Sequence, residues 1–279
     1  MIDVLVTYLP LSRTDEIKAY FTQNVDIISP KKVLIYVDTR GEEPEFTLSL
    51  PFDYRLVFGD WWDRNLCWLK MLGDFRAQGF DNILVVDSDN TLNPDFQRID
   101  KELLEAGHGF YTVLDTECLP ELFISSSNQP KRLGSTLVRY WEIFKLGRNF
   151  FDIGPKQAVR LDARFLDKIE PTLIKELESI MSSLPPHDRN YIKDEWTLGV
   201  LAYNAGYRYV PWVVGSTHHP RPKENSRIQE IRAAEARVRW ALRLTRTNGW
   251  RALAIATYYF GVLVFSKLSG RTTAPIRSG

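Results

Sequence analysis

The stretch from Asn82 to Phe96 (NILVVDSDNTLNPDF) constrains the fold of this chain more than any other. Its apolar run, Ile83 to Val86, is typical of a strand that is buried on both faces of a parallel sheet. Further strands are predicted at residues 2–8, 32–37, 54–58 and 109–114, with helices over 12–27 and 60–78. Strands that alternate with helices predict an α/β fold with a mostly parallel, twisted sheet flanked by helices.

The second half of the chain has a less regular pattern. Helices are predicted at 137–146 and 171–181, and a third helix is ended by Gly206 and followed by a strand that ends at Pro211. The 279 residues are 44% hydrophobic and 25% charged, which is enough for a sizeable core. We divide the chain into an α/β domain, 1–220, and a C-terminal segment, 221–279.

Two carboxylates follow the buried strand directly, Asp87 and Asp89. Alternate residues on extended backbone face the same way, so both carboxylates can point at one position in space. Like charges so close repel each other unless a cation lies between them, and hard oxygen ligands suit Mg²⁺ or Mn²⁺. We therefore predict a metal site at Asp87 and Asp89. The alternative is an ordinary turn, in which Asp is common.

Four segments occur in an order that points to a known family. They are Asp38 at a strand end, Arg64-Asn65 at the start of a helix, the Asp87-Ser88-Asp89 turn, and Asp194-Glu195 before a helix and YNAGYRYVP, 203–211. Together they resemble the GT-A glycosyltransferases, specifically the large inverting family that includes dolichyl-phosphate-mannose synthase and cellulose synthase. The resemblance covers about residues 1–215, and it implies the GT-A fold.

The resemblance also implies roles for the residues of the donor site. Tyr8 and Asp38 would contact the nucleotide base and ribose, and Arg64 would lie near the nucleotide or its diphosphate. Asp87 would lie on the sugar or ribose side, and Asp89 would bind the metal ion that bridges the diphosphate.

The acidic pair Asp194 and Glu195 is implied to be catalytic, with Glu195 as the base. The order here is Asp-Glu, whereas the family usually has Glu-Asp. If the reaction inverts the sugar, a carboxylate takes the proton of the acceptor hydroxyl. If the acceptor is already a phosphate, Glu195 orients it more than it deprotonates it.

Each of these residues has a plainer structural interpretation. Asp38 is also a common turn residue before Arg40 and Gly41. Arg64 can pair with neighbouring acids on the surface of its helix. The acidic pair can be stabilised by the positive end of a helix dipole without any catalytic role.

The segment after the last predicted strand adds basic candidates. His218 is a third candidate metal ligand, because imidazole is a common ligand and some GT-A enzymes complete their metal site with a histidine here. Arg221 and Lys223 are suited to binding a diphosphate. A solvent-facing His218-His219 loop is the alternative.

The C-terminal segment is strongly basic. From Arg221 onward there are twelve Lys/Arg against three Asp/Glu, which leaves 24 basic and 32 acidic residues before it. Residues 227–246 have the spacing of an amphipathic helix with arginines on one face. Such a segment is expected to meet an anionic membrane surface. Nucleic acid is the less favoured partner, because no nucleic-acid motif accompanies the arginines.

Residues 252–265 (ALAIATYYFGVLVF) carry no charge. A helix of that length spans about 21 Å, which is short of the ~30 Å hydrocarbon core. Basic residues flank it on both sides, which favours an in-plane or re-entrant helix on the cytoplasmic face. The alternative is a helix that packs on the protein itself or on a second subunit.

These observations predict a metal-dependent hexosyltransferase that is associated with a membrane. The donor would be GDP-mannose or a UDP-sugar, and the acceptor a polyprenyl phosphate or a lipid-linked glycan. One alternative is a sugar-nucleotide nucleotidyltransferase, which is disfavoured because Leu9 to Ser12 contains no glycine for a phosphate loop. The other is a module that binds nucleotide or membrane without catalysis.

Overall fold

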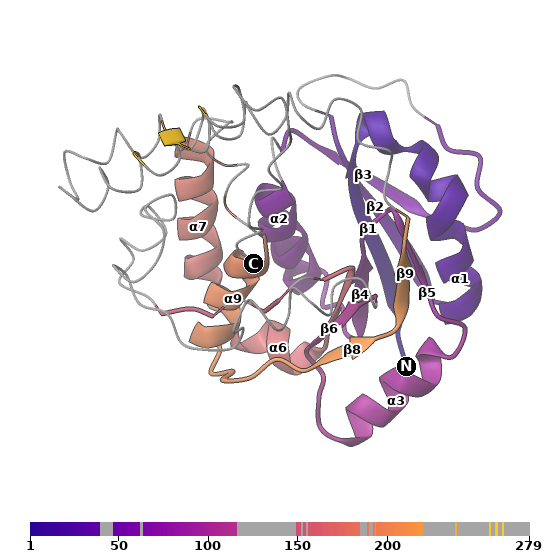
Figure 1. The fold of residues 1–279 in the computed structure, drawn as a ribbon. Coiled ribbons are helices and arrows are strands. Elements are labelled where there is room, and N and C mark those ends of the chain that lie inside the picture. Colours follow the sequence, from indigo (N-terminus) through magenta and orange to yellow (C-terminus); the bar gives the residue numbers. More distant parts are fainter. Residues whose placement is uncertain are drawn as a thin grey trace.

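The computed structural model describes residues 1–39, 47–61, 64–115, 149–151, 153–154, 156–184 and 194–219, and single positions at 189, 192, 238, 257, 260, 261 and 264. Its centre is a seven-stranded sheet in the order β3-β2-β1-β4-β7-β6-β8 (Figure 1). The strands are β1 Val4–Pro10, β2 Lys32–Asp38, β3 Arg55–Gly59, β4 Ile83–Val86, β6 Tyr111–Leu114, β7 Ala158–Leu161 and β8 Trp212–Val214.

The sheet is parallel apart from one strand. β1 pairs in parallel with β2 and β4, β2 with β3, and β6 with β8, whereas β7 runs antiparallel to both β4 and β6. The register joins Val86 of β4 to Ala158 of β7. The start of β7 therefore lies at the edge of the sheet where β4 ends.

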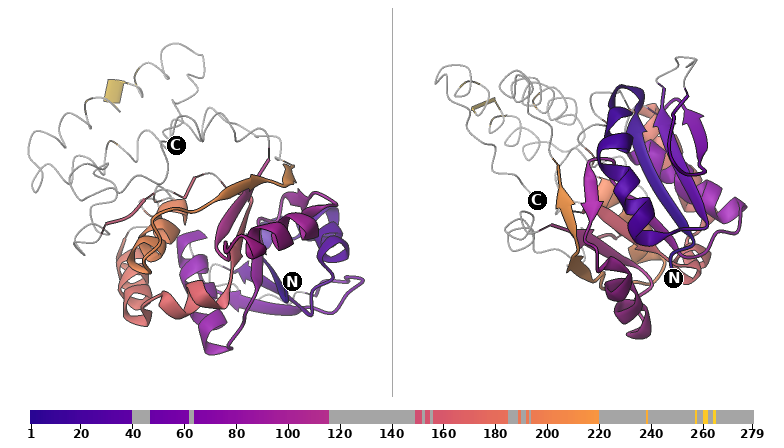
Figure 2. Two further views of the ribbon diagram at one scale, coloured as in Figure 1. Left: turned by 90° about the horizontal axis from the view of Figure 1, so that it is seen from below. Right: turned by 90° about the vertical axis from the view of Figure 1, so that its right-hand side faces the viewer.

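Helices cover both faces of this sheet (Figures 1 and 2). One face carries the π-helical turn η2 (Ile17–Phe21), α1 (Thr22–Ile28) and α3 (Phe96–Glu105), and the other carries α2 (Arg64–Ala77), α6 (Ala163–Lys168), α7 (Pro171–Ser183) and α9 (Asp194–Asn204). The alternation of side chains along β1 feeds two cores. Val6 packs in the α2 core and Leu5 in the α1 core, and both are fully buried.

A separate two-stranded ribbon lies beside α1, where β5 (Asn90–Leu92) pairs antiparallel with β9 (Ser216–His218). The buried side chain of Asn24 in α1 holds it by donating to the Asn90 carbonyl oxygen (2.9 Å) and accepting the Leu92 N–H (2.7 Å). This ribbon fixes the backbone that follows the turn with Asp87 and Asp89, while β4 of the main sheet fixes the backbone that precedes it.

The structure confirms the predicted α/β class, the mostly parallel sheet and the two-sided helical cover. The helix predicted over 12–27 is confirmed from residue 15 to 28, where η2 continues directly into α1, whereas its predicted start is the 3-10 helix η1 (Leu11–Arg13). The predicted strand before Pro211 is wrong. The strand β8 begins after the proline, whose carbonyl oxygen accepts the Thr112 N–H at 3.0 Å.

Other predictions fall where the structure describes little. The predicted helix 137–146 lies outside the described residues, and so does the segment 221–279 except for positions 238, 257, 260, 261 and 264, which are helical. Among the residues that are described, no helix is long and apolar enough to cross a membrane. The division at residue 220 therefore stays a prediction.

Candidate functional site

The carboxyl ends of β1 and β4 bring Tyr8 and Asp87 together. The two strands are parallel neighbours, and Tyr8 lies in the last half of β1 while Asp87 follows β4. The Tyr8 hydroxyl donates to Oδ1 of Asp87 at 2.7 Å. This is the edge at which open α/β sheets place their ligands.

The start of helix α9, more than a hundred residues later in the chain, also lies next to Tyr8. Asp194 and Glu195 occupy its first turn, where the helix dipole favours negative charge. Oδ2 of Asp194 lies 3.3 Å from the Tyr8 hydroxyl. One tyrosine therefore connects the Asp-x-Asp turn with the acidic pair, two motifs that lie more than a hundred residues apart.

Helix α9 is tied to α2 by a buried asparagine. The side chain of Asn65, which follows Arg64 in α2, donates to the Ile192 carbonyl oxygen and accepts from the Thr197 hydroxyl. These bonds bracket the start of α9. The Arg-Asn pair of the sequence thus positions the acidic pair through its asparagine.

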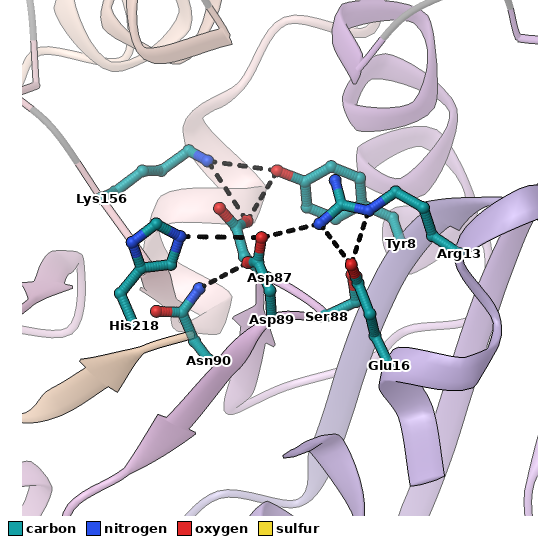
Figure 3. A network of polar contacts seen from close by, with 9 residues as sticks. All are labelled: Tyr8, Arg13, Glu16, Asp87, Ser88, Asp89, Asn90, Lys156 and His218. Atoms are coloured by element: carbon teal, nitrogen blue, oxygen red, sulfur yellow. Dashed lines mark hydrogen bonds and ion pairs between the residues drawn. The ribbon is translucent and has the colours of Figure 1, made fainter. Parts of the chain in front are cut away.

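A lysine completes the cluster, and sequence analysis did not single it out. Nζ of Lys156 lies 3.7 Å from Oδ1 of Asp87 and 3.3 Å from the Tyr8 hydroxyl (Figure 3). It also lies 2.8 Å from Oδ2 of Asp194. Its side chain is 1% exposed. The lysine lies two residues before the start of β7. It is at the carboxyl edge of β4 because β7 runs antiparallel to that strand.

These contacts set the charges of the cluster. Burial raises the pKa of Asp87 above its usual value, against the opposing attraction of Lys156 and Arg64. Burial also disfavours the charged form of Asp194, but Lys156 and Arg64 outweigh it and lower its pKa. For Lys156 itself the two carboxylates outweigh burial and raise the pKa of the ammonium group. Lys156 is therefore a cation and Asp194 an anion at neutral pH.

Burial, and then the charge of Asp87, raises the pKa of Tyr8 far above its usual value. The phenol therefore stays protonated at neutral pH. Its hydroxyl can only act as a donor toward Asp87, which matches the 2.7 Å contact.

Asp89 belongs to a second set of contacts. Oδ2 of Asp89 lies 2.7 Å from Nη2 of Arg13 and 3.6 Å from Nε2 of His218, and its Oδ1 accepts from the Asn90 side chain at 2.9 Å (Figure 3). Arg13 also pairs with Glu16, a buried carboxylate that accepts from the Ser88 hydroxyl. The turn between Asp87 and Asp89 is thus held by ionic contacts on both sides.

The two adjacent histidines have different partners. His218 faces Asp89, whereas the ring of His219 stacks on Tyr20 with centroids 4.3 Å apart and lies 3.0 Å from the Thr91 hydroxyl. The His219 N–H donates to the Asp89 carbonyl oxygen at 2.8 Å. Only His218 is placed to share a ligand with Asp89.

The side chains around Asp89 supply some, but not all, of the ligand atoms that a divalent cation requires. In the described part of the chain, no group of three or more His, Cys, Asp or Glu lies close enough to hold a metal ion. Asp89 and His218 supply two donors, and the buried Oδ1 of Asn90 has no hydrogen-bond partner there. Mg²⁺ is typically held by one or two carboxylates together with substrate phosphates. Asp89 and His218 are therefore suited to such an ion, provided that Arg13 leaves Asp89.

Of four further predicted residues, two have other surroundings and two lie outside the described part of the chain. Oδ1 of Asp38 accepts the Trp61 N–H at 2.9 Å, so this carboxylate links the end of β2 to the approach to α2. Arg64 opens α2 and lies near enough to Asp87 and Asp194 to lower the pKa of both. Arg221 and Lys223 lie outside the described residues.

The sequence held weak signals for the two residues that were missed. Arg13 ends η1, which directly follows β1, the strand that carries Tyr8, so topology alone places it at the carboxyl edge. Lys156 follows Gly154 and Pro155, and the short segment after it, Ala158–Leu161, is the strand β7. Only the direction of that strand would have revealed the lysine, and a four-residue run does not encode it.

No protein-family model matches this chain, and no curated protein matches it significantly.

Proposed function

We propose that this chain is a GT-A-type glycosyltransferase that transfers a hexose from a nucleotide-diphosphate sugar. The observation that carries the proposal is the meeting of the Asp87–Asp89 turn and the Asp194-Glu195 helix start through the hydroxyl of Tyr8. A carboxylate pair for a sugar nucleotide and an acidic pair for an acceptor must be adjacent for transfer between them. The convergence at the carboxyl edge of a parallel sheet supports this arrangement.

The donor would lie over the ends of β1 and β4. Tyr8, Asp38 and Arg64 would contact the nucleotide, and Asp87 would accept hydroxyls of the ribose or sugar. Asp89 and His218 would hold Mn²⁺ or Mg²⁺. When bound, the ion neutralises the charge of the leaving diphosphate as a Lewis acid.

The acceptor would approach the start of α9. Glu195 would take the proton of an acceptor hydroxyl or orient an acceptor phosphate, and a base within hydrogen-bond reach contributes about 10²–10⁴-fold. The neighbouring Asp194 is held as an anion by Lys156, 2.8 Å away. This fixed negative charge beside Glu195 would favour the transfer of the acceptor's proton to Glu195.

The acceptor we propose is membrane-linked, such as a polyprenyl phosphate or a lipid-linked glycan. The support is in the sequence: twelve basic residues against three acidic ones after residue 220, and an uncharged stretch at 252–265. Such segments bind anionic surfaces without crossing them. Flotation of the full chain and of a chain ending at residue 220 with vesicles of zwitterionic or partly anionic lipid tests this. Equal flotation of both chains would rule it out.

The donor is tested by thermal unfolding with GDP-, UDP- and dTDP-sugars, each with and without Mn²⁺. A ligand at a hundred times its dissociation constant stabilises the fold by about 2.7 kcal/mol. One nucleotide should stabilise the wild type only with the metal, and Asp89→Ala should abolish the effect. Asp167→Ala, on the exposed face of α6, is the matched control. If no sugar nucleotide stabilises the wild type, the proposal is wrong.

Turnover separates an enzyme from a binding module. Donor hydrolysis or transfer should fall at least a hundredfold in Glu195→Gln, while nucleotide binding is retained. A wild type that binds the donor with no turnover on any membrane-linked acceptor would instead indicate the binding module.

A further inference from the structure

The least expected group in the site is a buried cation. The side chain of Lys156 is 1% exposed, and taking an ammonium ion out of water costs several kcal/mol unless it is well paired. A lysine used only to anchor a surface carboxylate would keep its amino group in water. This burial indicates a defined role inside the site.

Four groups compensate the charge of Lys156. Two are the carboxylates of Asp194 (2.8 Å) and Asp87 (3.7 Å), and the third is the Tyr8 hydroxyl (3.3 Å). The fourth is the ring of Trp68, whose centroid lies 5.1 Å from Nζ, within the range of a cation–π contact. The cation is surrounded by described partners on β1, α2 and α9 as well as on the Asp-x-Asp turn.

The backbone fixes where the lysine lies. The next residue, Gln157, accepts the Asp87 N–H and donates its own N–H to the Val113 carbonyl oxygen, both at 2.8 Å. Its side chain accepts the Asp115 N–H at 3.3 Å. Lys156 is therefore attached to a rigid point between the ends of β4 and β6, and Asp87 cannot move away from it without breaking the sheet edge.

The two aspartates of the turn have different partners, and Lys156 faces only Asp87. Oδ1 of Asp87 is bonded to Tyr8 and faces Lys156, whereas Oδ2 of Asp89 faces Arg13 and His218 (Figure 3). Asp87 does not need a divalent ion to balance its charge, because Lys156 already does so. An ion at Asp89 would then bind without Asp87 as a ligand. In an Asp-x-Asp motif both carboxylates are expected to face one metal ion, whereas here Asp87 faces Lys156 of the protein itself.

We propose that Lys156 is a positioning residue that removes Asp87 from the metal's ligand set and holds it, side by side with Asp194, to accept hydroxyl groups of the donor. This inference rests on the proposed function. The ligand class is a polyol, the ribose or hexose of a sugar nucleotide. A carboxylate that is fixed by a buried cation presents its remaining lone pairs in one direction, and a site built in this way rejects an analogue that lacks the hydroxyl.

The metal part of the inference is tested without any nucleotide. Mn²⁺ binding is followed by the loss of the free-ion signal in electron paramagnetic resonance for the wild type, Asp87→Asn, Asp89→Asn and Lys156→Met. The exposed Lys175→Met, on α7, is the control. Asp89→Asn should weaken binding at least tenfold, whereas Asp87→Asn should change it less than twofold. An equal loss in the two aspartate variants, or a wild type that binds no Mn²⁺, overturns the inference.

The hydroxyl part is tested by calorimetry with the nucleotide diphosphate, the complete sugar nucleotide and its deoxy-sugar or deoxyribose analogues. Lys156→Met should weaken the complete donor at least tenfold, and it should abolish the preference of the wild type over the deoxy analogue. Lys156→Arg keeps the charge and should recover part of that preference. Unchanged discrimination in Lys156→Met overturns the inference, because a merely structural lysine would alter stability alone.

If Lys156→Met does not fold, the double variant Lys156→Met/Asp194→Asn removes the charges together and restores a neutral pair. It should bind Mn²⁺ as the wild type does and still lack hydroxyl discrimination; retained discrimination would refute the role of Lys156. Failure of the proposed function has a different signature. Then no sugar nucleotide binds, while the Mn²⁺ titrations of the two aspartate variants still decide whether Asp87 is a ligand.

Discussion

Replacing Arg13 with glutamine should strengthen the binding of a divalent cation at Asp89. Nη2 of Arg13 lies 2.7 Å from Oδ2 of Asp89, the same oxygen that lies 3.6 Å from Nε2 of His218. An ion that binds between this carboxylate and the imidazole must displace the guanidinium group. In the wild type the free energy of binding is reduced by the cost of breaking that pair, and in Arg13→Gln this cost is absent.

The size of the effect follows from the burial of the pair. The side chains of Arg13 and Asp89 are 23% and 13% exposed. A fully exposed pair contributes about 0–1 kcal/mol, and the Coulomb energy of two charges 4 Å apart at an effective dielectric of 20 is about 4 kcal/mol. A partly exposed pair lies between them, at about 1–2 kcal/mol. At 1.4 kcal/mol per factor of ten, the dissociation constant for Mn²⁺ should fall about 5- to 30-fold.

The measurement is an Mn²⁺ titration at pH 7 without nucleotide, read by electron paramagnetic resonance. Arg13→Lys retains a shorter cation and should give an intermediate affinity. Arg98→Gln, which removes an exposed pair with Asp95, is the control. An Arg13→Gln protein that binds Mn²⁺ as weakly as the wild type, or more weakly, refutes the idea that Arg13 and the metal compete for one carboxylate.

The same substitution should also destabilise the fold. Arg13 pairs with Glu16, whose side chain is 2% exposed, so the glutamine variant leaves a buried carboxylate with fewer donors. The free energy of unfolding should fall by about 1–3 kcal/mol. Metal titrations therefore belong well below the unfolding midpoint of the variant.

Three further predictions concern the acidic pair and the helix that carries it. Asp194→Asn should lower the free energy of unfolding by about 3 kcal/mol at pH 7, because Lys156 loses its nearest anion in a buried site. Burial opposes the charged form of Asp194, but Lys156 outweighs burial and lowers the pKa of this carboxyl. The stabilisation is therefore present above pH ~4 and is lost as the pH falls through the lowered pKa. Urea unfolding of both proteins from pH 7 to pH 3 checks this. Asn65→Ala should cost about 1–3 kcal/mol and lower kcat more than donor affinity, because it releases the start of α9 and leaves the donor residues in place; calorimetry and steady-state kinetics separate the two. Gly199→Ala should cost at least ~1–3 kcal/mol, because its Cβ would lie 1.6 Å from a backbone carbonyl oxygen, whereas Gly73→Ala in α2 meets no atom within 4 Å and should stabilise by about 0.5–1 kcal/mol.

The sheet could be predicted wherever a strand lies between a helix and a turn signal. The strands at 83–86 and 54–58 and the buried positions Leu66, Leu69 and Phe75 of α2 follow directly from apolar periodicity. The strand near Pro211 was misplaced because Tyr207 to Val210 has the composition of a strand, whereas the parallel neighbour β6 pairs from Trp212 onward. Composition records that a segment is apolar, but its partner strand decides where pairing begins.

Among the residues of the candidate site, the sequence indicated the acidic ones and a histidine. Asp87, Asp89, Asp194 and His218 could be singled out because each lies at the end of an element. Their cationic partners could not, because Arg13 and Lys156 are distant in sequence from the carboxylates they contact. Periodicity reports which face of an element is buried, and it contains no information about which charges from remote segments meet.

The antiparallel strand β7 explains how a lysine can serve this site at all. In an all-parallel sheet, only the residues that follow the strands reach the carboxyl edge, and a residue that precedes a strand lies at the opposite edge, a full strand length away. Because Ala158 pairs with Val86 in antiparallel register, the residues just before β7 lie beside Asp87 instead. Reversal of one strand thus places a cation on a backbone already bonded to the Asp87 N–H, with no mobile loop between them. If Lys156 positions Asp87 as proposed, shortening the side chain by Lys156→Ala should impair hydroxyl discrimination even though the sheet register is unchanged.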